Sequence, residues 1–178
     1  MSRQKNPEVE TSPTQTEPTG ILEARAREFI SSKNPLQRGS NCKAVLVAPD
    51  DVPYIWDKIL PYIELSQTDE KELSPDDFLD SLVGGEMQLW VIVEDKEIIA
   101  CIISRFANYP QKKVFRIVFV GGEGMKKWLE FLPIVEDFAL MNGCTFIEVW
   151  GRKAWLRILK DWKCTYHIIT KDLTARMH

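Results

Sequence analysis

A stretch near the carboxyl end, residues 114–164, constrains the fold of this chain most strongly. Two runs of β-branched and aromatic residues, Val114–Val120 and Thr145–Trp150, are typical of strands that are covered on both faces. Between them lie a glycine turn, Gly121–Gly124, and an apolar-faced helix predicted from Met125 to Met141. Because a helix joins the two strands, the simplest arrangement is a parallel βαβ crossover. Ligands of such units tend to bind at the carboxyl ends of the strands, which here is the glycine turn.

Capping residues and apolar periodicity predict the remaining elements. We expect a strand at Lys43–Ala48 and then a helix that Asp50 or Asp51 caps and that Pro61 bends or ends early. A second helix should be capped by Ser74, with Pro75 in its first turn and Gly84–Gly85 at its end. The remaining elements are an antiparallel hairpin of Leu89–Val93 and Ile98–Ser104, a polar turn at Asn108–Lys113, a short basic helix at Lys153–Trp162 and a last strand at Tyr166–Thr170. Pro133, inside the long helix, should bend its axis.

These elements predict one α+β domain, residues 41–174, with a mixed, mainly antiparallel central sheet, one parallel βαβ unit and helices on both faces. The chain has 178 residues, 44% of them hydrophobic, which suffices for one core. Residues 1–40 are expected to form a flexible arm, because their first half contains almost no large apolar side chain. A short helix at 21–32 carries the arm's apolar residues, and residues 175–178 form a tail.

Composition argues against several classes of function. The net charge of −3 gives no general attraction to nucleic acid, and no run approaches the roughly 20 apolar residues of a membrane span. The four cysteines lie far apart without a Cys-x-x-Cys pair, which favours reduced, buried thiols over disulfides or metal ligands. We therefore expect that the protein binds no metal ion. We also expect that it is made in a cytoplasm.

The order of elements and residues 114–164 together resemble the GNAT superfamily, the acetyl-coenzyme-A-dependent N-acyltransferases. In that family a glycine loop of the form Arg/Gln-x-x-Gly-x-Gly/Ala holds the pyrophosphate of the cofactor, and here it falls on Phe119–Gly124. The resemblance implies cofactor binding by five residues of this region, with the Val120 N–H polarising the thioester carbonyl: Val120, Gly121, Gly122, Gly124 and Lys126.

The chain departs from the family pattern at two places. Phe119 stands where Arg or Gln is expected, and Glu123 adds a negative charge to a loop that would receive a dianion. The family's usual catalytic acid is a Tyr four residues after an Ala, and here Ile158 follows Ala154 at that spacing. Glu148 is the best candidate for a general base, with Glu94 next. Glu148 is alternatively a strand-face residue paired with Arg116 or Arg152.

Two segments are candidates for partner binding. Ile21, Leu22, Phe29 and Ile30 form an apolar stripe on the helix of the arm, which either docks on a partner or serves as a linker. Arg152 and Arg157 concentrate positive charge near Trp155, which suits a phosphate or an acidic surface, although a solvated amphipathic helix explains the same pattern.

The sequence pattern from Val120 to Lys160 is also similar to small GNAT-like proteins of tailed bacteriophages, including internal virion proteins of podoviruses. The pattern consists of Val120–Glu123, Trp128, Leu132 and the segment Gly151–Lys160. That resemblance implies a non-catalytic interaction module without cofactor, made in the host cytoplasm and then carried in the virion. Its arm would bind other virion or assembly proteins, and further copies of the chain are also candidate partners. The alternative is an active N-acetyltransferase that uses acetyl-coenzyme A on an amine.

Overall fold

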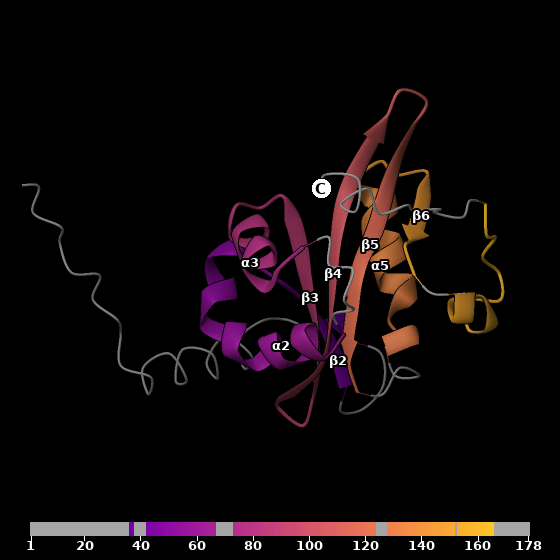
Figure 1. The fold of residues 1–178 in the computed structure, drawn as a ribbon. Coiled ribbons are helices and arrows are strands. Elements are labelled where there is room, and N and C mark those ends of the chain that lie inside the picture. Colours follow the sequence, from indigo (N-terminus) through magenta and orange to yellow (C-terminus); the bar gives the residue numbers. More distant parts are fainter. Residues whose placement is uncertain (1–35, 38–41, 67–72, 124–127, 152, 166–178) are drawn as a thin grey trace, which may run out of the picture.

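The computed structural model describes residues 36–37, 42–66, 73–123, 128–151 and 153–165 (Figure 1). A six-stranded sheet, in which the strands lie in the order of the sequence, forms its centre. The strands are β1 (Leu36–Gln37), β2 (Cys42–Val47), β3 (Met87–Glu94), β4 (Glu97–Tyr109), β5 (Lys112–Gly122) and β6 (Phe146–Val149). Neighbouring strands pair antiparallel except β5 and β6, which pair parallel. The predicted mixed sheet with one parallel crossover is thereby confirmed.

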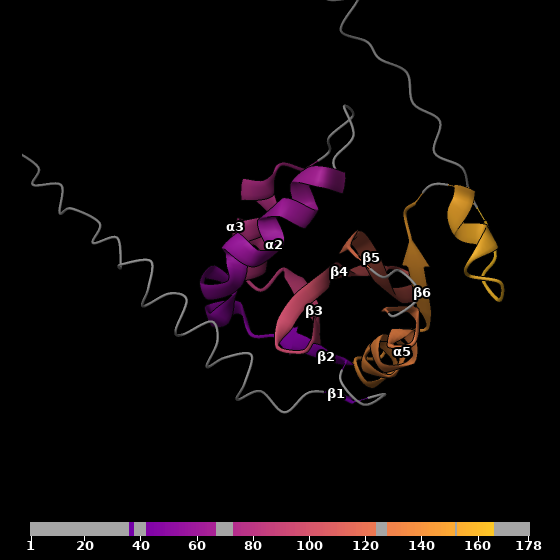
Figure 2. The same ribbon diagram turned by 90° about the horizontal axis from the view of Figure 1, so that it is seen from below.

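Helices cover both faces of the sheet, as the apolar runs predicted (Figures 1 and 2). Helices α2 (Val52–Ser66) and α3 (Pro75–Val83) lie on one face, and α5 (Leu132–Met141) lies on the other. Alternate residues of one strand enter different cores: Leu89 and Val91 of β3 pack under α2 and α3, whereas Trp90 and Ile92 pack on the α5 side. Each face of the sheet therefore has its own apolar core.

Both hairpins of the sheet have tight turns. Asp95 and Lys96 join β3 to β4 with positive φ angles of 49° and 72°, which suits the twist of a two-residue hairpin. The second turn is shorter than the predicted Asn108–Lys113, because β4 runs on to Tyr109 and β5 begins at Lys112. Extended pairing on both sides of Pro110 leaves only two residues for the turn.

Helix α2 begins close to its predicted start and is longer than predicted. A 3-10 turn, Pro49–Asp51, precedes the helix, and Ala48 at its N-cap makes no side-chain cap. The helix itself begins at Val52, directly after Asp51, one of the two residues predicted to cap it. Pro61 does not end the helix, since α2 continues through it to Ser66. The buried stripe of Ile55, Ile59 and Ile63 packs on both sides of the proline, and this burial outweighs the lost hydrogen bond.

The predicted ends of α3 are confirmed. Ser74 and Asp77 form a reciprocal capping box, in which the Ser74 hydroxyl accepts from the Asp77 N–H and the Asp77 carboxylate accepts from the Ser74 N–H. Pro75 occupies the first turn, and the chain leaves the helix at Gly84 and Gly85, the latter with a φ of 73°.

The long helix predicted from Met125 to Met141 is interrupted. Trp128 and Leu129 are helical, Glu130 and Phe131 form a turn, and α5 begins only at Leu132. Pro133 lies in the first turn of α5, where its missing N–H costs nothing, so it starts a helix rather than bending one. The predicted helix Lys153–Trp162 is likewise shorter, a 3-10 helix, η2, at Lys153–Arg157.

The helix, the strand and the arm predicted near the two ends of the chain are described only in small part. The helix at 21–32 and the strand at Tyr166–Thr170 lie outside the described residues. Within the predicted arm of residues 1–40, Leu36 and Gln37 pair with Ala44 and Lys43 of β2.

Candidate functional site

The edge of β5 at its carboxyl end is the most informative backbone feature of the fold. β6 pairs with β5 only from Val114 to Ile117, whereas β4 pairs with β5 as far as Gly122. A register shift opposite Ile103 and Ser104 leaves Val118 as an extra, bulged residue. From Val118 to Gly122, the side of β5 that faces away from β4 has no strand partner among the described residues. We call this segment the open edge of β5.

The backbone N–H of Val120 points to the open edge. The Glu123 N–H donates to the Ile99 carbonyl over 2.7 Å, which fixes these two residues as a hydrogen-bonded antiparallel pair. Hydrogen-bonded and non-hydrogen-bonded pairs alternate along such a ladder, so Val120, opposite Ile102, directs its N–H and C=O away from β4. An extended ligand with amide groups can pair with an edge of this kind.

Gly121 and Gly122 are required by packing, whatever they bind. A Cβ on Gly122 would lie 2.4 Å from the Cα of Ala100, and the residue has a φ of 114°. A Cβ on Gly121 would lie 2.7 Å from the ring of Phe119. These two glycines therefore have a structural role in the close approach of β5 to β4 and α2.

The loop after β5 has fewer free backbone N–H donors for an anion, among its described residues, than the glycine pattern predicted. The Glu123 N–H is already bonded to Ile99, and its side chain is exposed at the end of the strand. Burial, and secondarily the negative charge of Glu123, raise the pKa of Tyr62, whose hydroxyl donates to the Ile98 carbonyl over 2.8 Å. Gly124 and Lys126 lie outside the described residues. The described part of the loop thus presents a carboxylate to a pyrophosphate.

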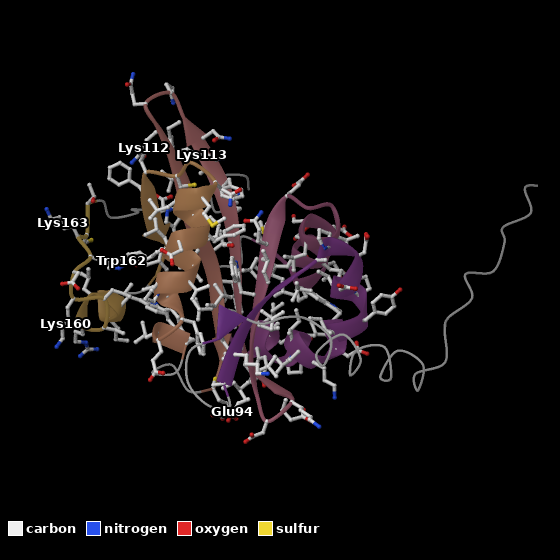
Figure 3. All side chains as sticks on the ribbon, turned by 180° about the vertical axis from the view of Figure 1, so that it is seen from behind. Glu94, Lys112, Lys113, Lys160, Trp162 and Lys163 are labelled. Atoms are coloured by element: carbon white, nitrogen blue, oxygen red, sulfur yellow. The ribbon has the colours of Figure 1, made fainter. Side chains whose placement is uncertain are left out.

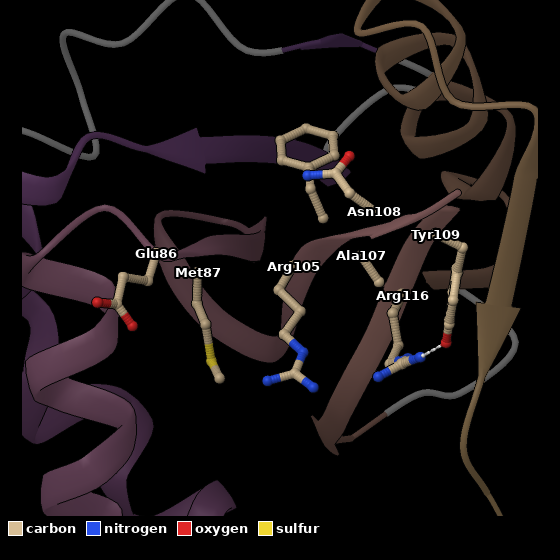
Figure 4. A pocket seen from close by; sticks show the side chains of 8 residues that line it. Glu86, Met87, Arg105, Ala107, Asn108, Tyr109 and Arg116 are labelled. Carbon is tan, nitrogen blue, oxygen red and sulfur yellow. Dashed lines mark hydrogen bonds between the residues drawn. The ribbon is translucent and has the colours of Figure 1, made fainter. Parts of the chain in front are cut away.

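Glu148, the candidate base, forms an ion pair with Arg116. The two residues lie directly opposite one another on the parallel strands β6 and β5, and the Arg116 Nε–H donates to the Glu148 carboxylate. Arg116 also donates from Nη2 to the Tyr109 hydroxyl over 2.5 Å (Figure 4). Its guanidinium lies 4.0 Å from the centre of the Trp150 ring. The strand-face interpretation of Glu148 with Arg116 therefore describes its contacts.

Arg116 is nearly buried, with 4% of its surface exposed, and a buried guanidinium needs a carboxylate nearby. Glu148 supplies that charge. A proton taken up by Glu148 would leave Arg116 uncompensated, so the ion pair works against a role of Glu148 as a base.

The basic segment lies on the flank beyond β6. Arg157 is exposed at the end of η2, while Trp155 packs against Trp128 with ring centres 5.4 Å apart. Lys160 and Lys163 point away from the sheet (Figure 3). Arg152 and the arm residues Ile21, Leu22, Phe29 and Ile30 lie outside the described residues. The described part of this segment is a solvated face, with half-buried Trp155 packed on buried Trp128.

Among the described residues, the buried cysteines are poor nucleophiles. Burial raises the pKa of the Cys101 thiol to about 12 and also raises the pKa of Cys144. Among the described residues there is no cluster of His, Cys, Asp and Glu suited to a metal ion. No described helix has the length and apolar character needed to cross a membrane.

Sequence reasoning missed the side chains that gather around Arg116. Tyr109 and Trp150 contact its guanidinium, and Arg105 of β4 lies directly opposite it. A signal was present, since residues two apart on a strand share a face and Arg105, Ala107 and Tyr109 follow that period. The sequence alone did not give the register that sets Arg105 against Arg116.

No protein-family model matches the sequence, and no curated protein matches it. Solved structures do match in fold. An aminoglycoside acetyltransferase from an uncultured soil metagenomic sample, in complex with sisomicin, has a TM-score of 0.56 at 12% identity over 73% of this chain and 95% of that one. A GCN5-related N-acetyltransferase from Ralstonia eutropha JMP134 has a TM-score of 0.57 at 13% identity over 74% and 98%.

A predicted acetyltransferase from Clostridium acetobutylicum, solved with acetyl-CoA, has a TM-score of 0.54 at 13% identity over 77% of this chain and 98% of that one. At these identities the likeness concerns the fold and not the activity. The order of the strands, the parallel pair at β5 and β6 and these neighbours together show that the chain has the fold of the GNAT acetyltransferases.

Proposed function

We propose that this chain is a non-catalytic GNAT-fold protein that serves as an interaction module of a bacteriophage virion or of its head assembly. The observation that supports the loss of catalysis best is the ion pair of Glu148 with Arg116, which occupies the carboxylate best placed to accept a proton. Glu123 at the mouth of the open edge and Ile158 in place of the family's Tyr add to it.

The assembly role draws on the arm and on the sequence resemblance to small phage proteins. The first half of residues 1–40 is too poor in apolar side chains to fold alone. The second half carries an apolar stripe of Ile21, Leu22, Phe29 and Ile30. Such a stripe suits docking on another virion protein. In this role the domain holds the arm in place, and the chain needs no cofactor.

Two measurements test this proposal. Isothermal titration with coenzyme A and acetyl-coenzyme A should give no heat at millimolar ligand, and acetyl-coenzyme A should release no thiol with a panel of amines. Deleting residues 1–40 should abolish incorporation into assembled particles, while Lys58→Gln, at an exposed position of α2, should assemble normally. Normal assembly of the truncated protein would rule out the arm as the docking element.

An active N-acetyltransferase is the second candidate, and the free N–H of Val120 favours it. That N–H would polarise the thioester carbonyl, Gly122, Gly124 and Lys126 would face the pyrophosphate, and Glu148 would take the proton of the amine. The nitrogen would attack the acetyl carbon directly, so that a C–N bond forms, the C–S bond breaks and coenzyme A leaves as the thiol. Glu148 would first have to separate from Arg116.

The same titration separates the two candidates. Micromolar binding of coenzyme A together with a thermal shift of several degrees would support the enzyme. In that case Gly124→Asp should abolish binding with an unchanged circular dichroism spectrum.

A further inference from the structure

A concavity of about 400 Å³ opens on the face of the sheet that carries α2 and α3, beside the amino end of β3 (Figure 4). Its walls include Met87 of β3 and Arg105, Ala107 and Tyr109 of β4. Arg116 of β5 forms part of the floor. The open edge of β5 begins two residues further along the same strand, so the concavity and the edge are distinct places on β5.

Two arginines face each other in this concavity. Arg105 and Arg116 are direct partners in the antiparallel pairing of β4 and β5, so their side chains lie on the same face of the sheet. Like charges in this position repel each other. One of the two charges is neutralised, because Arg116 is paired with Glu148 and bonded to Tyr109.

Within the described ranges, the charge of Arg105 has no acidic partner. The Arg105 side chain is half-buried, yet its guanidinium makes no ion pair, hydrogen bond or ring contact with any residue that the structure describes. In the close-up its guanidinium points into the concavity, between Met87 and Arg116. Keeping a half-buried guanidinium unpaired is costly for a fold, and the cost is offset when an anion binds there.

The surroundings of Arg105 select the kind of anion. Glu86 also lines the concavity, with Met87 between it and Arg105, and its carboxylate disfavours a ligand with two negative charges. Met87 and Ala107 offer apolar contact on either side of the guanidinium. A planar carboxylate accepts two parallel hydrogen bonds from a guanidinium.

We propose that this concavity binds a small monocarboxylate, whose carboxylate pairs with Arg105 while its apolar part packs against Met87 and Ala107. The inference goes beyond the proposed function and does not depend on it, because none of these residues belongs to the open edge of β5 or to the arm.

Benzoate is a suitable probe, with benzamide as its neutral analogue and phenyl phosphate as a dianionic one. Titration of the full chain, followed by ¹H–¹⁵N correlation spectra, should give saturable shifts at Ala107 and Asn108 with benzoate. The dissociation constant should rise about tenfold or more in Arg105→Gln, since a charge-assisted bidentate contact is lost. Arg157→Gln, which removes an exposed arginine elsewhere, should leave it unchanged.

Ala107→Phe provides a second variant, which fills the concavity without removing a charge and should also abolish the shifts. The proposal is overturned if benzoate produces no saturable shifts, if benzamide or phenyl phosphate binds as tightly as benzoate, or if Arg105→Gln binds benzoate as the unmodified chain does. Coenzyme A titrations of Arg105→Gln report on the proposed function separately, because Arg105 lies apart from the open edge.

Discussion

Arg116 on β5 and Glu148 on β6 form an ion pair across the parallel strands, with the guanidinium almost entirely buried and the carboxylate side chain 28% exposed. This arrangement links the stability of the fold to the residue that family resemblance would make the catalytic base. The carboxylate therefore has a role even in a protein without activity.

Glu148→Gln should destabilise the protein by about 2 kcal/mol, because it leaves the Arg116 guanidinium buried without its counter-charge. Urea denaturation followed by tryptophan fluorescence measures the change in the free energy of unfolding. Glu130→Gln, at an exposed turn position, is the matched control and should change that free energy little. An unchanged midpoint for Glu148→Gln would show that the ion pair does not stabilise the fold.

Gly122→Ala should destabilise by about 3 kcal/mol or more, since the new methyl would lie 2.4 Å from the Cα of Ala100 at a φ of 114°. Thermal unfolding gives the size of the effect. Gly143→Ala is a useful comparison, because Gly143 also has a positive φ, of 75°, but a Cβ there meets no atom within 4 Å. A Gly122→Ala protein as stable as Gly143→Ala would contradict the steric argument.

Thiol chemistry should separate the cysteines by burial. With its pKa raised to about 12, Cys101 carries almost no thiolate at pH 8, and Cys144 is shifted in the same direction by burial. Exposed Cys164 should react with iodoacetamide in the native protein, whereas Cys101 and Cys144 should react only after unfolding. Peptide mapping by mass spectrometry measures each rate. Equal native rates for Cys101 and Cys164 would show that Cys101 is accessible.

The capping box of α3 predicts a dependence of stability on pH. Hydrogen bonds from the Ser74 hydroxyl and N–H lower the pKa of Asp77 below its ordinary value of 3.8. A lowered folded-state pKa means that the contribution is present above the unfolded pKa and is lost as the pH falls through the folded value.

Ser74→Ala should therefore melt at a lower temperature than the unmodified protein at pH 7, and the difference should shrink as the pH falls below about 3.8. Thermal melts across this range measure it. Ser81→Ala, within the body of the same helix, is the control. A difference between Ser74→Ala and the unmodified protein that is independent of pH would exclude Asp77 as its source.

The sequence predicted those parts of the fold that local rules determine. The strands followed from β-branched runs, the parallel pair from the intervening helix, and both ends of α3 from Ser74 and Gly84. The passage of α2 through Pro61 did not follow, because burial of Ile55, Ile59 and Ile63 on the sheet overrides a local break.

The contacts within the candidate site were predicted only in part, because they depend on the register of the strands. The pair of Glu148 with Arg116 was one of two predicted alternatives, the other being Arg152, and the contact of Arg116 with Tyr109 was not predicted. That contact depends on the two-residue turn after Tyr109, which sets the register of β4 against β5. The longer turn predicted at Asn108–Lys113 left that register undetermined. The unpaired Arg105 was missed because only that register brings it opposite Arg116.

β3 and β4 supply alternate residues to two separate cores, and this has a consequence for how the domain unfolds. Neither layer of helices can detach without exposing one side of the same strands, so the two layers should lose structure together. Amide hydrogen exchange should be slowest in the middle of these strands, around Val91 and Ile102, and equally slow for residues facing either layer. Cooperativity in this protein is then a property of its sheet.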